Sequence, residues 1–505
     1  MELNMKYTFA ALLTAALLAI GTAAPAGGTE THITKIDFAS CVPETLMISP
    51  DGKHVACALK KGERTAVFAD GKEGATYDSV MKGTPVYSPD SRRMAFGASA
   101  GDAAFMVVDG SGEVFCEGIL NTPYIFSPDS SRIAYGVQRG GKQSIVCDGK
   151  IGAEYDGIME DTPIFSSDGK RVAYGASRGG HQLAVIDSVE SELYEGVGTL
   201  LFSPDGKHVA YTAKKNNKWF TVRDGIKGKS YDGFLKNCIA FTNDSNKFIF
   251  AARESEKIFL VVDGREHKKY PSMLMGSLAI SRKGESHVYI AGDGKKIFVV
   301  YNGAEGKRYD DIAQASLMLS EDGKHFIYCA KEKFRWKLIL DGREADKSYE
   351  EIFPLSVLIS PDGKMWGYIA REGDKKYVVI NNEESKAYTD IGFDSLVFSR
   401  DCKHWAYAAK RGSKCFMVYD GRELDSYEGI GNFTFSPDCR HFAYIATKNG
   451  KKIVVIDETA GKPYDDIANA WMTGKLRFDE KSLRVSYTAL SGNDFLFVES
   501  PVKKD

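Results

Sequence analysis

The sequence has no excess of charge of either sign, since 66 Lys and Arg stand against 68 Asp and Glu and the formal net charge is −2. A protein that binds nucleic acid through its phosphates normally has a basic surplus, so we predict no nucleic acid partner. Long apolar runs are also scarce, which excludes a protein that spans a membrane several times. With 43% hydrophobic and 11% aromatic residues, the 505-residue chain has the composition of a large soluble globular protein.

The one concentrated apolar stretch lies near the N-terminus, where Lys6 is followed by residues 10–20 and then by the small residues 21–26. A charged start, a short apolar centre and an Ala-x-Ala ending are typical of a secretory signal peptide. The eleven apolar residues are too few for a permanent membrane helix, so we prefer a signal peptide to the alternative of an uncleaved anchor. We therefore predict a signal peptide over residues 1–26. The mature chain is then periplasmic or extracellular, with no membrane insertion after cleavage.

The cysteines do not follow the spacing of a metal site or of a redox-active pair. The nine cysteines are an odd number, and no C-x-x-C pair or metal-like Cys/His spacing occurs. Most of them lie inside apolar strand patterns, where Cys is a common small buried residue. We interpret them as mainly structural thiols, with one or two disulfides left open and no pairing assigned.

One segment recurs along the whole mature chain and is clearest at residues 202–211, which read Phe-Ser-Pro-Asp-Gly-Lys-His-Val-Ala-Tyr. Successive copies lie 37 to 40 residues apart, and a weaker twelfth copy starts at Asp479. A register held over this length marks a repeat architecture. The Ser or Thr of each clear copy is Ser49, Ser88, Ser127, Ser166, Ser203, Thr242, Ser281, Ser320, Ser360, Ser399 or Ser436.

Each repeat contains only β signals. The turn is followed by a short apolar run such as Val209–Ala213, and then by a second run such as Ile258–Val262 that ends in Asp-Gly. Asp-Gly between apolar runs predicts a tight hairpin, because both residues tolerate a positive φ. A third run carries an aromatic residue, and a fourth, such as Ser395–Phe398, leads into the next turn. Four short antiparallel strands repeated in this way predict the blades of a β-propeller.

The Ser-Pro-Asp-Gly-Lys turn followed by an apolar strand resembles the repeats of the TolB-type, WD-repeat-like β-propeller family. The resemblance covers nearly all of the mature chain. TolB itself carries an α/β domain before its propeller, for which the residues before Ser49 leave no room. Members of the family are mostly bacterial and often exported, and their roles range from protein-binding scaffold to gating domain of a peptidase. The resemblance therefore implies an architecture more than an activity.

Twelve blades exceed the roughly four to eight of a usual propeller, so we expect two rings. Residues 38–48 align as a third and fourth strand, whereas residues 485–498 supply only a first and second. Residues 270–280 match residues 38–48 in length, which places a second start in the middle of the chain. The prediction is thus an all-β protein of about twelve four-stranded blades in two six-bladed propellers, over residues 36–263 and 264–498. Residues 27–35 would form a linker and residues 499–505 a tail, and other splits, such as seven plus five blades, stay open.

Two segments match the hydrolase motif G-x-S-x-G, namely residues 97–101 and 175–179. That motif needs a turn from a strand into a helix, with an acid and a His downstream. Both copies fall at one position of the repeat, in the turn between two strands, where no helix follows. We therefore interpret Ser99 and Ser177 as turn residues and assign no catalytic residue.

Five of the nine histidines share one register, which we place at the start of the innermost strand: His54, His208, His325, His404 and His441. In the second ring His325, His404 and His441 would then gather near one channel mouth, where three imidazoles can hold zinc or another transition metal. The alternative, which we favour, is that His is the polar lead-in that each repeat inherits. No metal and no cofactor is therefore assigned.

Two further sets of residues recur in the repeats. The Asp of the Ser-Pro-Asp turn, such as Asp205, occurs once per blade, and we expect it to accept backbone N–H groups within the turn. Trp219 and Trp336 share one strand register, and Trp366 and Trp405 lie in neighbouring blades. Such tryptophans can stack on a sugar or a peptide, but at strand positions we expect them to form core between blades.

These observations favour an exported, non-enzymatic β-propeller that serves as a binding or scaffold module for a protein or a small ligand in the cell envelope. One alternative is a hydrolase or lyase with its active site at a channel mouth, and another is a passive envelope component without a small ligand. The partner or ligand itself is not identified by the sequence.

Overall fold

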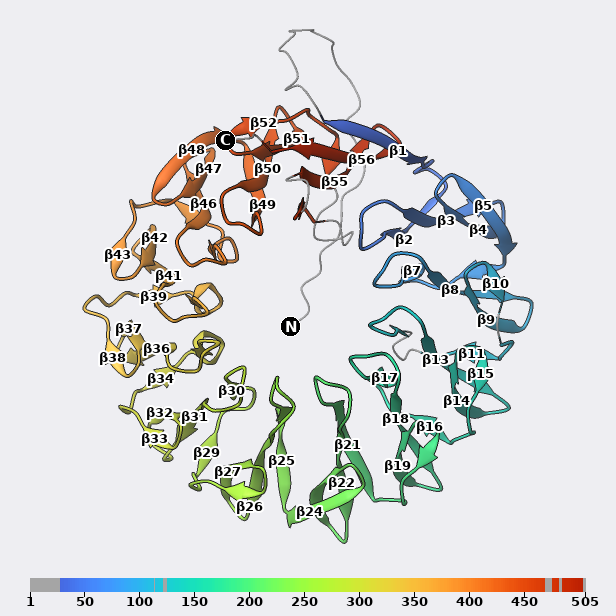
Figure 1. Cartoon of the computed structure of the whole chain (residues 1–505), viewed down its shortest axis with the longest axis horizontal. Helices are drawn as coiled ribbons and strands as arrows, with labels where there is room; N and C mark the ends of the chain where they lie inside the picture. Colours follow the sequence, from blue (N-terminus) through green and yellow to red (C-terminus); the bar gives the residue numbers. More distant parts are fainter. Residues whose placement is uncertain (1–27, 113, 121–124, 468–474, 481–483, 503–505) are drawn as a thin grey trace.

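The computed structural model describes residues 28–112, 114–120, 125–467, 475–480 and 484–502. In these residues the only helical elements are two short 3₁₀ turns, η1 (Gln314–Ser316) and η2 (Pro354–Ser356). The strands form twelve small antiparallel sheets that follow one another around a single ring (Figure 1). We number the sheets as blades 1 to 12 in chain order. The predicted signal peptide, residues 1–26, lies outside the described residues.

The innermost position of each blade faces the middle of the ring (Figure 1). In most blades this strand is interrupted, so that two short pieces pair with the same second strand. The pieces are β2 (Cys41–Ile48), β6 (Ser79–Val80) with β7 (Val86–Tyr87), β11 (Gly118–Ile119) with β12 (Ile125–Phe126), β16 (Gly157–Ile158) with β17 (Ile164–Phe165), β21 (Gly196–Phe202), β25 (Gly233–Phe241), β29 (Ser272–Met273) with β30 (Ala279–Ile280), β34 (Asp311–Ile312) with β35 (Met318–Leu319), β39 (Glu351–Ile352) with β40 (Leu358–Ile359), β44 (Asp390–Ile391) with β45 (Val397–Phe398), β49 (Gly429–Phe435), and β53 (Asp466–Ile467) with β54 (Arg477–Asp479).

The second and third strands are the long hairpin at the centre of each blade. The second strands are β3 (Val55–Lys61), β8 (Met94–Ala100), β13 (Ile133–Arg139), β18 (Val172–Arg178), β22 (Val209–Lys215), β26 (Phe248–Glu254), β31 (His287–Gly292), β36 (Phe326–Glu332), β41 (Trp366–Glu372), β46 (Trp405–Arg411), β50 (Phe442–Lys448) and β55 (Arg484–Ser491). The third strands are β4 (Arg64–Ala69), β9 (Ala103–Val108), β14 (Lys142–Cys147), β19 (His181–Ile186), β23 (Lys218–Arg223), β27 (Lys257–Val262), β32 (Ile297–Tyr301), β37 (Arg335–Leu340), β42 (Lys375–Ile380), β47 (Lys414–Tyr419), β51 (Lys451–Ile456) and β56 (Asp494–Pro501).

The outer strands form the rim of the ring, and most contain only two residues. They are β5 (Lys72–Tyr77), β10 (Ser111–Gly112), β15 (Lys150–Ile151), β20 (Val189–Glu190), β24 (Ile226–Tyr231), β28 (Arg265–Glu266), β33 (Ala304–Glu305), β38 (Arg343–Glu344), β43 (Glu383–Glu384), β48 (Arg422–Tyr427), β52 (Thr459–Ala460) and, in blade 12, β1 (Thr29–Lys35). Very short edge strands offer little backbone for unwanted pairing with another chain.

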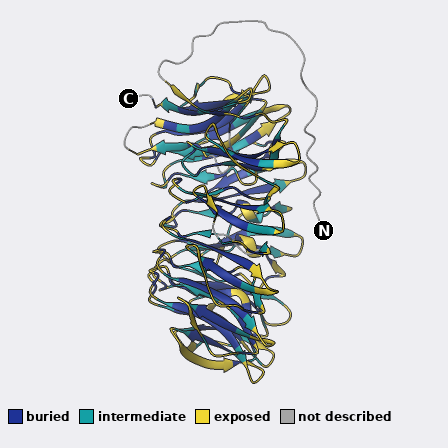
Figure 2. Ribbon diagram, turned by 90° about the vertical axis from the view of Figure 1, so that its right-hand side faces the viewer, coloured by how far each residue is buried: buried dark blue, intermediate teal, exposed yellow. Residues whose placement is uncertain are grey.

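The strand sequences follow from this stacking. Each blade packs between two others, so its central strands are buried on both faces (Figure 2) and read as continuous apolar runs. In β22, for example, residues 209–213 are all buried. The hairpin from the third to the outer strand turns on Asp-Gly, with φ of 46° at Asp263 and 80° at Gly264. Two positive φ values in succession match the type I′ turn that the sequence predicted.

The all-β class and the twelve blades are confirmed, but the expected division into two rings is not what the structure contains. Val262 of β27 pairs with Arg265 of β28, so the predicted boundary at residues 263 and 264 falls inside one hairpin of blade 6. In the segment 270–280, Pro271 stands where most other repeats have an acid that caps the hairpin between the second and third strands. In blade 7 the hairpin is capped by its own Asp293, which accepts the N–H groups of Lys295 and Lys296.

The ring closes in blade 12, and the closing contacts correct two further expectations. Residues 27–35 were predicted as a linker, yet β1 pairs antiparallel with β56, from Thr29 opposite Glu499 to Lys35 opposite Asp494. Strand β56 runs to Pro501, so the predicted tail at 499–505 begins inside a strand. Across the seam, Thr488 Oγ1 of blade 12 donates to the carbonyl of Gly52 in blade 1 at 2.7 Å. Just after β1, Ile36 is buried and Phe38 is exposed.

Candidate functional site

The Ser-Pro-Asp turns are structural units of the ring. In blade 5 the Asp205 carboxylate accepts the Lys207 N–H at 3.1 Å, and Ser203 Oγ accepts the His208 N–H at 3.0 Å. The Ser203 hydroxyl donates to the same carboxylate and is the main reason why the pKa of Asp205 is lowered to about 2. The expected role of this aspartate as a backbone acceptor is confirmed, and the same bonds recur in other blades, for example at Asp51 and Asp362.

The five histidines of the common register lie at the start of the second strand and not, as predicted, of the innermost strand. Each Nδ1 lies within hydrogen-bond distance of the aspartate of the hairpin turn in its own blade: His54–Asp70 2.7 Å, His208–Asp224 2.7 Å, His325–Asp341 2.7 Å, His404–Asp420 2.6 Å and His441–Asp457 2.8 Å. In blade 2 Arg93 takes the same place and bonds Asp109 at 2.8 Å. The described residues contain no group of three His, Cys, Asp or Glu side chains placed to hold a metal ion.

Ser99 and Ser177 lie near the ends of strands β8 and β18, not in the turns where the sequence placed them. Ser99 Oγ is 2.7 Å from Ser79 Oγ, and Ser177 Oγ donates to the carbonyl of Gly157 at 3.4 Å. The next element in each case is another strand of the same hairpin. The strand-to-helix turn that a G-x-S-x-G nucleophile requires is therefore missing at both serines.

We expect replacement of both Ser99 and Ser177 by Ala to shift the free energy of unfolding by only about 0.5 kcal/mol for each change, because neither hydroxyl is an obligatory buried partner. Ser166, in the same blade as Ser177, is fully buried and its hydroxyl caps a turn, so Ser166→Ala should cost about 1–2 kcal/mol. Urea unfolding measures the change in stability of each variant. Esterase and peptidase assays measure whether the protein turns over a substrate. Turnover by the wild type that disappears in the folded double variant would contradict this assignment.

Tyrosine–glutamate hydrogen bonds join neighbouring blades at six places around the ring. Tyr349 at the outer edge of blade 8 donates to Glu384 of blade 9 at 2.8 Å, and Tyr309 donates to Glu344 at 3.2 Å. Equivalent pairs are Tyr155–Glu190, Tyr231–Glu266, Tyr388–Glu423 and Tyr464–Glu30. Burial raises the pKa of Tyr231 to about 12, so these hydroxyls stay protonated donors at neutral pH. These residues are used to hold the ring together.

The tryptophans behave largely as the predicted core between blades. Trp366 is only 7% exposed and belongs to an apolar cluster that also contains Ile327 and Leu338 of blade 8. Its ring stacks on Tyr368, and Trp405 stacks on Tyr407 in the same way. Trp336 of β37 packs against the same cluster, and Trp219 lies on β23.

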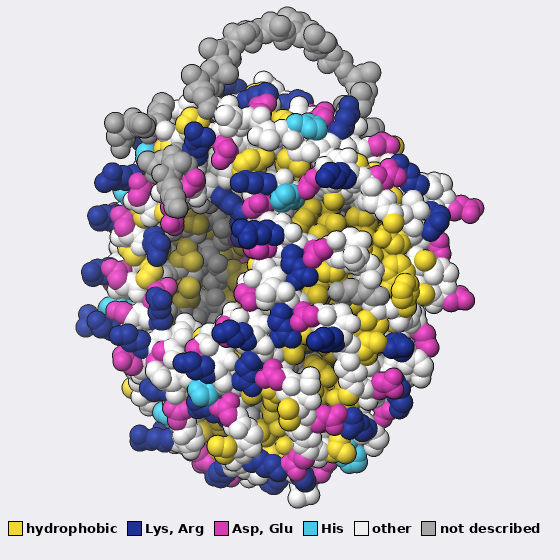
Figure 3. Space-filling view, turned by 45° about the vertical axis from the view of Figure 1, so that its right-hand side comes forward, with side chains coloured by type: hydrophobic (Ala, Val, Ile, Leu, Met, Phe, Trp, Pro, Cys, Tyr) yellow, Lys and Arg dark blue, Asp and Glu magenta, His cyan; other side chains and the backbone are white. Residues whose placement is uncertain are grey.

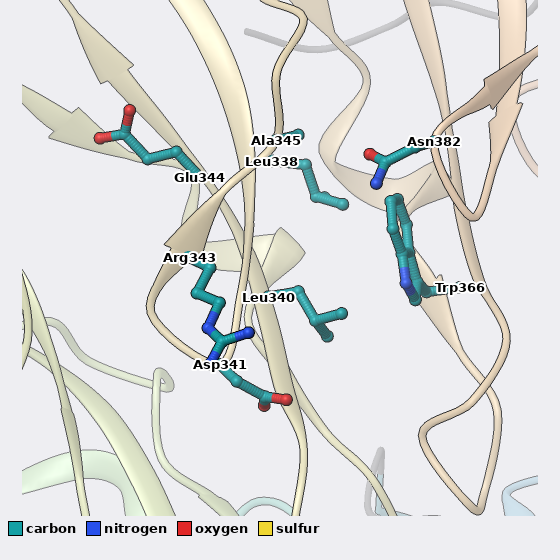
Figure 4. A pocket seen from close by; sticks show the side chains of 8 residues that line it. All are labelled: Leu338, Leu340, Asp341, Arg343, Glu344, Ala345, Trp366 and Asn382. Atoms are coloured by element: carbon teal, nitrogen blue, oxygen red, sulfur yellow. The ribbon is translucent and has the colours of Figure 1, made fainter.

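Grooves open between neighbouring blades on the outer side of the ring, and three of them enclose about 390 to 500 Å³. Each is formed by the third and outer strands of one blade and the second strand of the next: blades 5 and 6, 8 and 9, and 11 and 12. On the rim seen in Figure 3, charged side chains of both signs cover the surface and apolar patches lie between them. The pocket between blades 8 and 9 is drawn in Figure 4, with Arg343 on one wall and Trp366 on the other.

The loops that interrupt the innermost strands of blades 7, 9 and 10 carry large exposed apolar side chains. Met275 is 61% exposed, Leu355 69% and Phe393 56%. The loop of blade 8 touches those of blades 7 and 9: the Gln314 side chain of blade 8 donates to the Met275 carbonyl, and η1 of blade 8 lies against η2 of blade 9. We call Met275, Leu355 and Phe393 the inner apolar patch. The corresponding loops of blades 1, 2 and 4 present charged residues instead: Glu44, Lys82, Glu160 and Asp161.

Sequence reasoning did not single out the inner apolar patch, nor Arg343 of the pocket. The available signal was the departure from the repeat: Met, Leu and Phe where other loops carry polar residues, and Asn381-Asn382 where most blades have Asp-Gly. The nine cysteines, all within the described residues, are free thiols, so neither of the disulfides left open by the sequence is formed. None of the described helical elements is long and apolar enough to cross a membrane.

No protein-family model matches the chain, and no curated protein is similar enough to match it. Among solved structures, the crystal structure of a eukaryotic initiation factor is 15% identical, with a TM-score of 0.35; the match spans 66% of this chain and 94% of the initiation factor chain. The Dos1 propeller is 11% identical with a TM-score of 0.29, covering 61% and 94%. A GH74 enzyme of Niastella koreensis is 11% identical with a TM-score of 0.26, covering 92% of both chains. These likenesses are too distant to carry an argument about function, and the propeller architecture rests on the twelve sheets themselves.

Proposed function

We propose that this protein is an exported binding or scaffold module of the cell envelope, and that it holds a protein partner at the inner apolar patch. The observation that carries the proposal is the exposure of Met275, Leu355 and Phe393 in three nearby loops on the inner side of the ring. Large apolar side chains that gather on a surface mark interaction sites, because water contact with them costs free energy that a partner removes. Export is supported by the signal-like residues 1–26 and by the resemblance of the repeats to TolB-type propellers.

The three loops suit this role physically. Each is fixed at both ends by pairing with the second strand of its blade, as at Ile391 opposite Ala409 and Val397 opposite Ala406. A serine at the base of each loop is tied to the backbone; Ser356 Oγ accepts the Ile369 N–H and donates to the Phe353 carbonyl. A rigid scaffold under short loops limits the ordering entropy that binding has to overcome.

The test compares the triple variant Met275→Ser, Leu355→Ser, Phe393→Ser with the control Phe334→Ser. Phe334 is 87% exposed but lies in the hairpin between β36 and β37, outside the inner apolar patch. We expect affinity purification from the native envelope fraction to retain the same proteins with the wild type and the control, and to lose at least one of them with the triple variant. Identical sets for all three proteins would overturn the assignment of the site.

Export is tested separately by fractionating cells that make the tagged full-length chain. Recovery of a shortened chain from the periplasm or the medium supports export. A full-length chain confined to the cytoplasm would refute export without affecting the inner apolar patch.

A further inference from the structure

The pocket between blades 8 and 9 is lined by apolar side chains and by one arginine, Arg343, for which the described residues provide no hydrogen-bond or ion-pair partner. Leu338 and Leu340 of β37 and Ala345 form its floor, and Trp366 of β41 closes the opposite side. Arg343 of β38 lies on the side of the two leucines with its guanidinium toward Asp341, whereas Asn382 of the next blade lies beside Trp366 on the opposite side (Figure 4). The pocket encloses about 490 Å³, within the range of small-molecule sites.

Two of the three charged residues that line the pocket already have partners. Asp341 accepts the Phe326 N–H at 2.9 Å and lies 2.7 Å from His325 Nδ1. Glu344 accepts from Lys307 at 2.6 Å and from Lys337 at 3.1 Å, and the hydrogen bond from Lys307 lowers its pKa. The described part of the chain provides no hydrogen bond or ion pair to the guanidinium of Arg343. Arg343, which is exposed to solvent, is therefore the charged residue of the pocket that is free to bind a ligand.

Two blades further along, the arginine at the equivalent position, Arg422, forms an ion pair with a glutamate. Arg422 pairs with Tyr419 in its hairpin as Arg343 pairs with Leu340, so the two arginines are equivalent. Arg422 donates through both terminal nitrogens to Glu458 of blade 11, at 3.0 and 2.5 Å. Glu458 follows Asp457 in the hairpin turn as Asn382 follows Asn381, and both residues adopt a positive φ, 66° and 72°. Asn382 thus replaces the carboxylate that neutralises the equivalent arginine.

We propose that the pocket between blades 8 and 9 binds a small organic carboxylate with an aromatic or branched aliphatic body. The carboxylate takes the place that Glu458 occupies beside Arg422, because a guanidinium binds a carboxylate through two parallel N–H···O bonds. The amide of Asn382 adds a polar donor on the side of the pocket that Trp366 forms. The apolar body lies on Leu340 against the edge of Trp366. This site is independent of the inner apolar patch.

The test uses isothermal titration calorimetry of the full-length mature protein with 3-phenylpropionate. We expect saturable binding of 3-phenylpropionate and no binding of 3-phenylpropylamine, which carries the opposite charge. Arg343→Gln should weaken binding at least tenfold, whereas the equivalent change Arg422→Gln should leave it unchanged. Absence of saturable binding to the wild type, or equal affinity of wild type and Arg343→Gln, would overturn the proposal.

A second variant, Asn382→Glu, tests the argument in the opposite direction. It recreates the pair seen between Arg422 and Glu458, so it should abolish binding while the protein melts at the same temperature as the wild type or higher. A variant that is folded by circular dichroism and still binds 3-phenylpropionate with wild-type affinity would show that the unpaired guanidinium is not the anchor. Neither result bears on the partner purified through the inner apolar patch, so the two proposals fail separately.

Discussion

A mature chain that begins at Ile36 is expected to aggregate or to lose its cooperative unfolding transition, whereas a chain that begins at Thr29 is expected to melt like the mature protein. The difference is strand β1, whose pairing with β56 joins the two ends of the ring. Without it the long strand β56 becomes an open edge, which is prone to pair with other chains. Glu30 would also be lost, and with it the bonds to Lys462 and Tyr464 of blade 11.

Size-exclusion chromatography and thermal unfolding followed by circular dichroism measure this effect. Removal of residues 484–505 should have the same consequence, because it deletes β55 and β56 and leaves β1 without a partner. If the chain from Ile36 is monomeric and melts at the temperature of the chain from Thr29, β1 does not close the ring in solution.

The second large effect is expected at a glycine of a Ser-Pro-Asp-Gly turn. A Cβ atom on Gly363 would lie 2.2 Å from Cδ2 and 2.7 Å from Cβ of His325, in the preceding blade, and Gly363 has a φ of 71°. The His325 ring is held by Asp341 and cannot turn away without losing that bond. Gly363→Ala should therefore add overpacking to backbone strain, for a total of about 2–5 kcal/mol.

Gly373 is the matched control for this prediction. It also has a positive φ, 58°, but nothing lies within 4 Å of the position of a Cβ atom. Gly373→Ala should cost only the backbone term, about 1–2 kcal/mol. Denaturant unfolding of the two variants compares the costs directly, and equal losses of stability would show that the turns do not pack tightly between blades.

Much of each blade was predictable because its determinants lie close together in the sequence. The apolar runs at residues 209–213 and 258–262 became strands β22 and β27, and the Asp-Gly pairs became the hairpin turns between them and the rim. In every blade but the twelfth, strand pairing joins residues fewer than about 40 apart, so one repeat contains nearly all that is needed to form a blade. The role of the turn aspartates was predictable for the same reason.

The positions of the candidate site residues were predicted less well. His325, His404 and His441 were weighed as a cluster at a channel mouth and, by preference, as polar residues inherited by each repeat; in the structure each is paired with an aspartate 16 residues further along its own blade. The constant spacing of His or Arg to Asp was present in the sequence and would have identified this pair. The placement of these histidines on the innermost strand was wrong because the strand after the Ser-Pro-Asp turn is the second from the middle of the ring.

The sequence by itself determined the repeating unit, because turn chemistry and strand burial act within one blade. Only the tertiary structure decided that twelve blades form one ring, since closure depends on how neighbouring blades pack and on the meeting of β1 and β56, more than 450 residues apart. It likewise decided which side chains remain available for binding. Arg343 and Arg422 occupy the same place in their blades, but one is unpaired and the other is neutralised because the next blade presents Asn382 or Glu458. That difference arises between blades, where packing brings together residues about 40 positions apart.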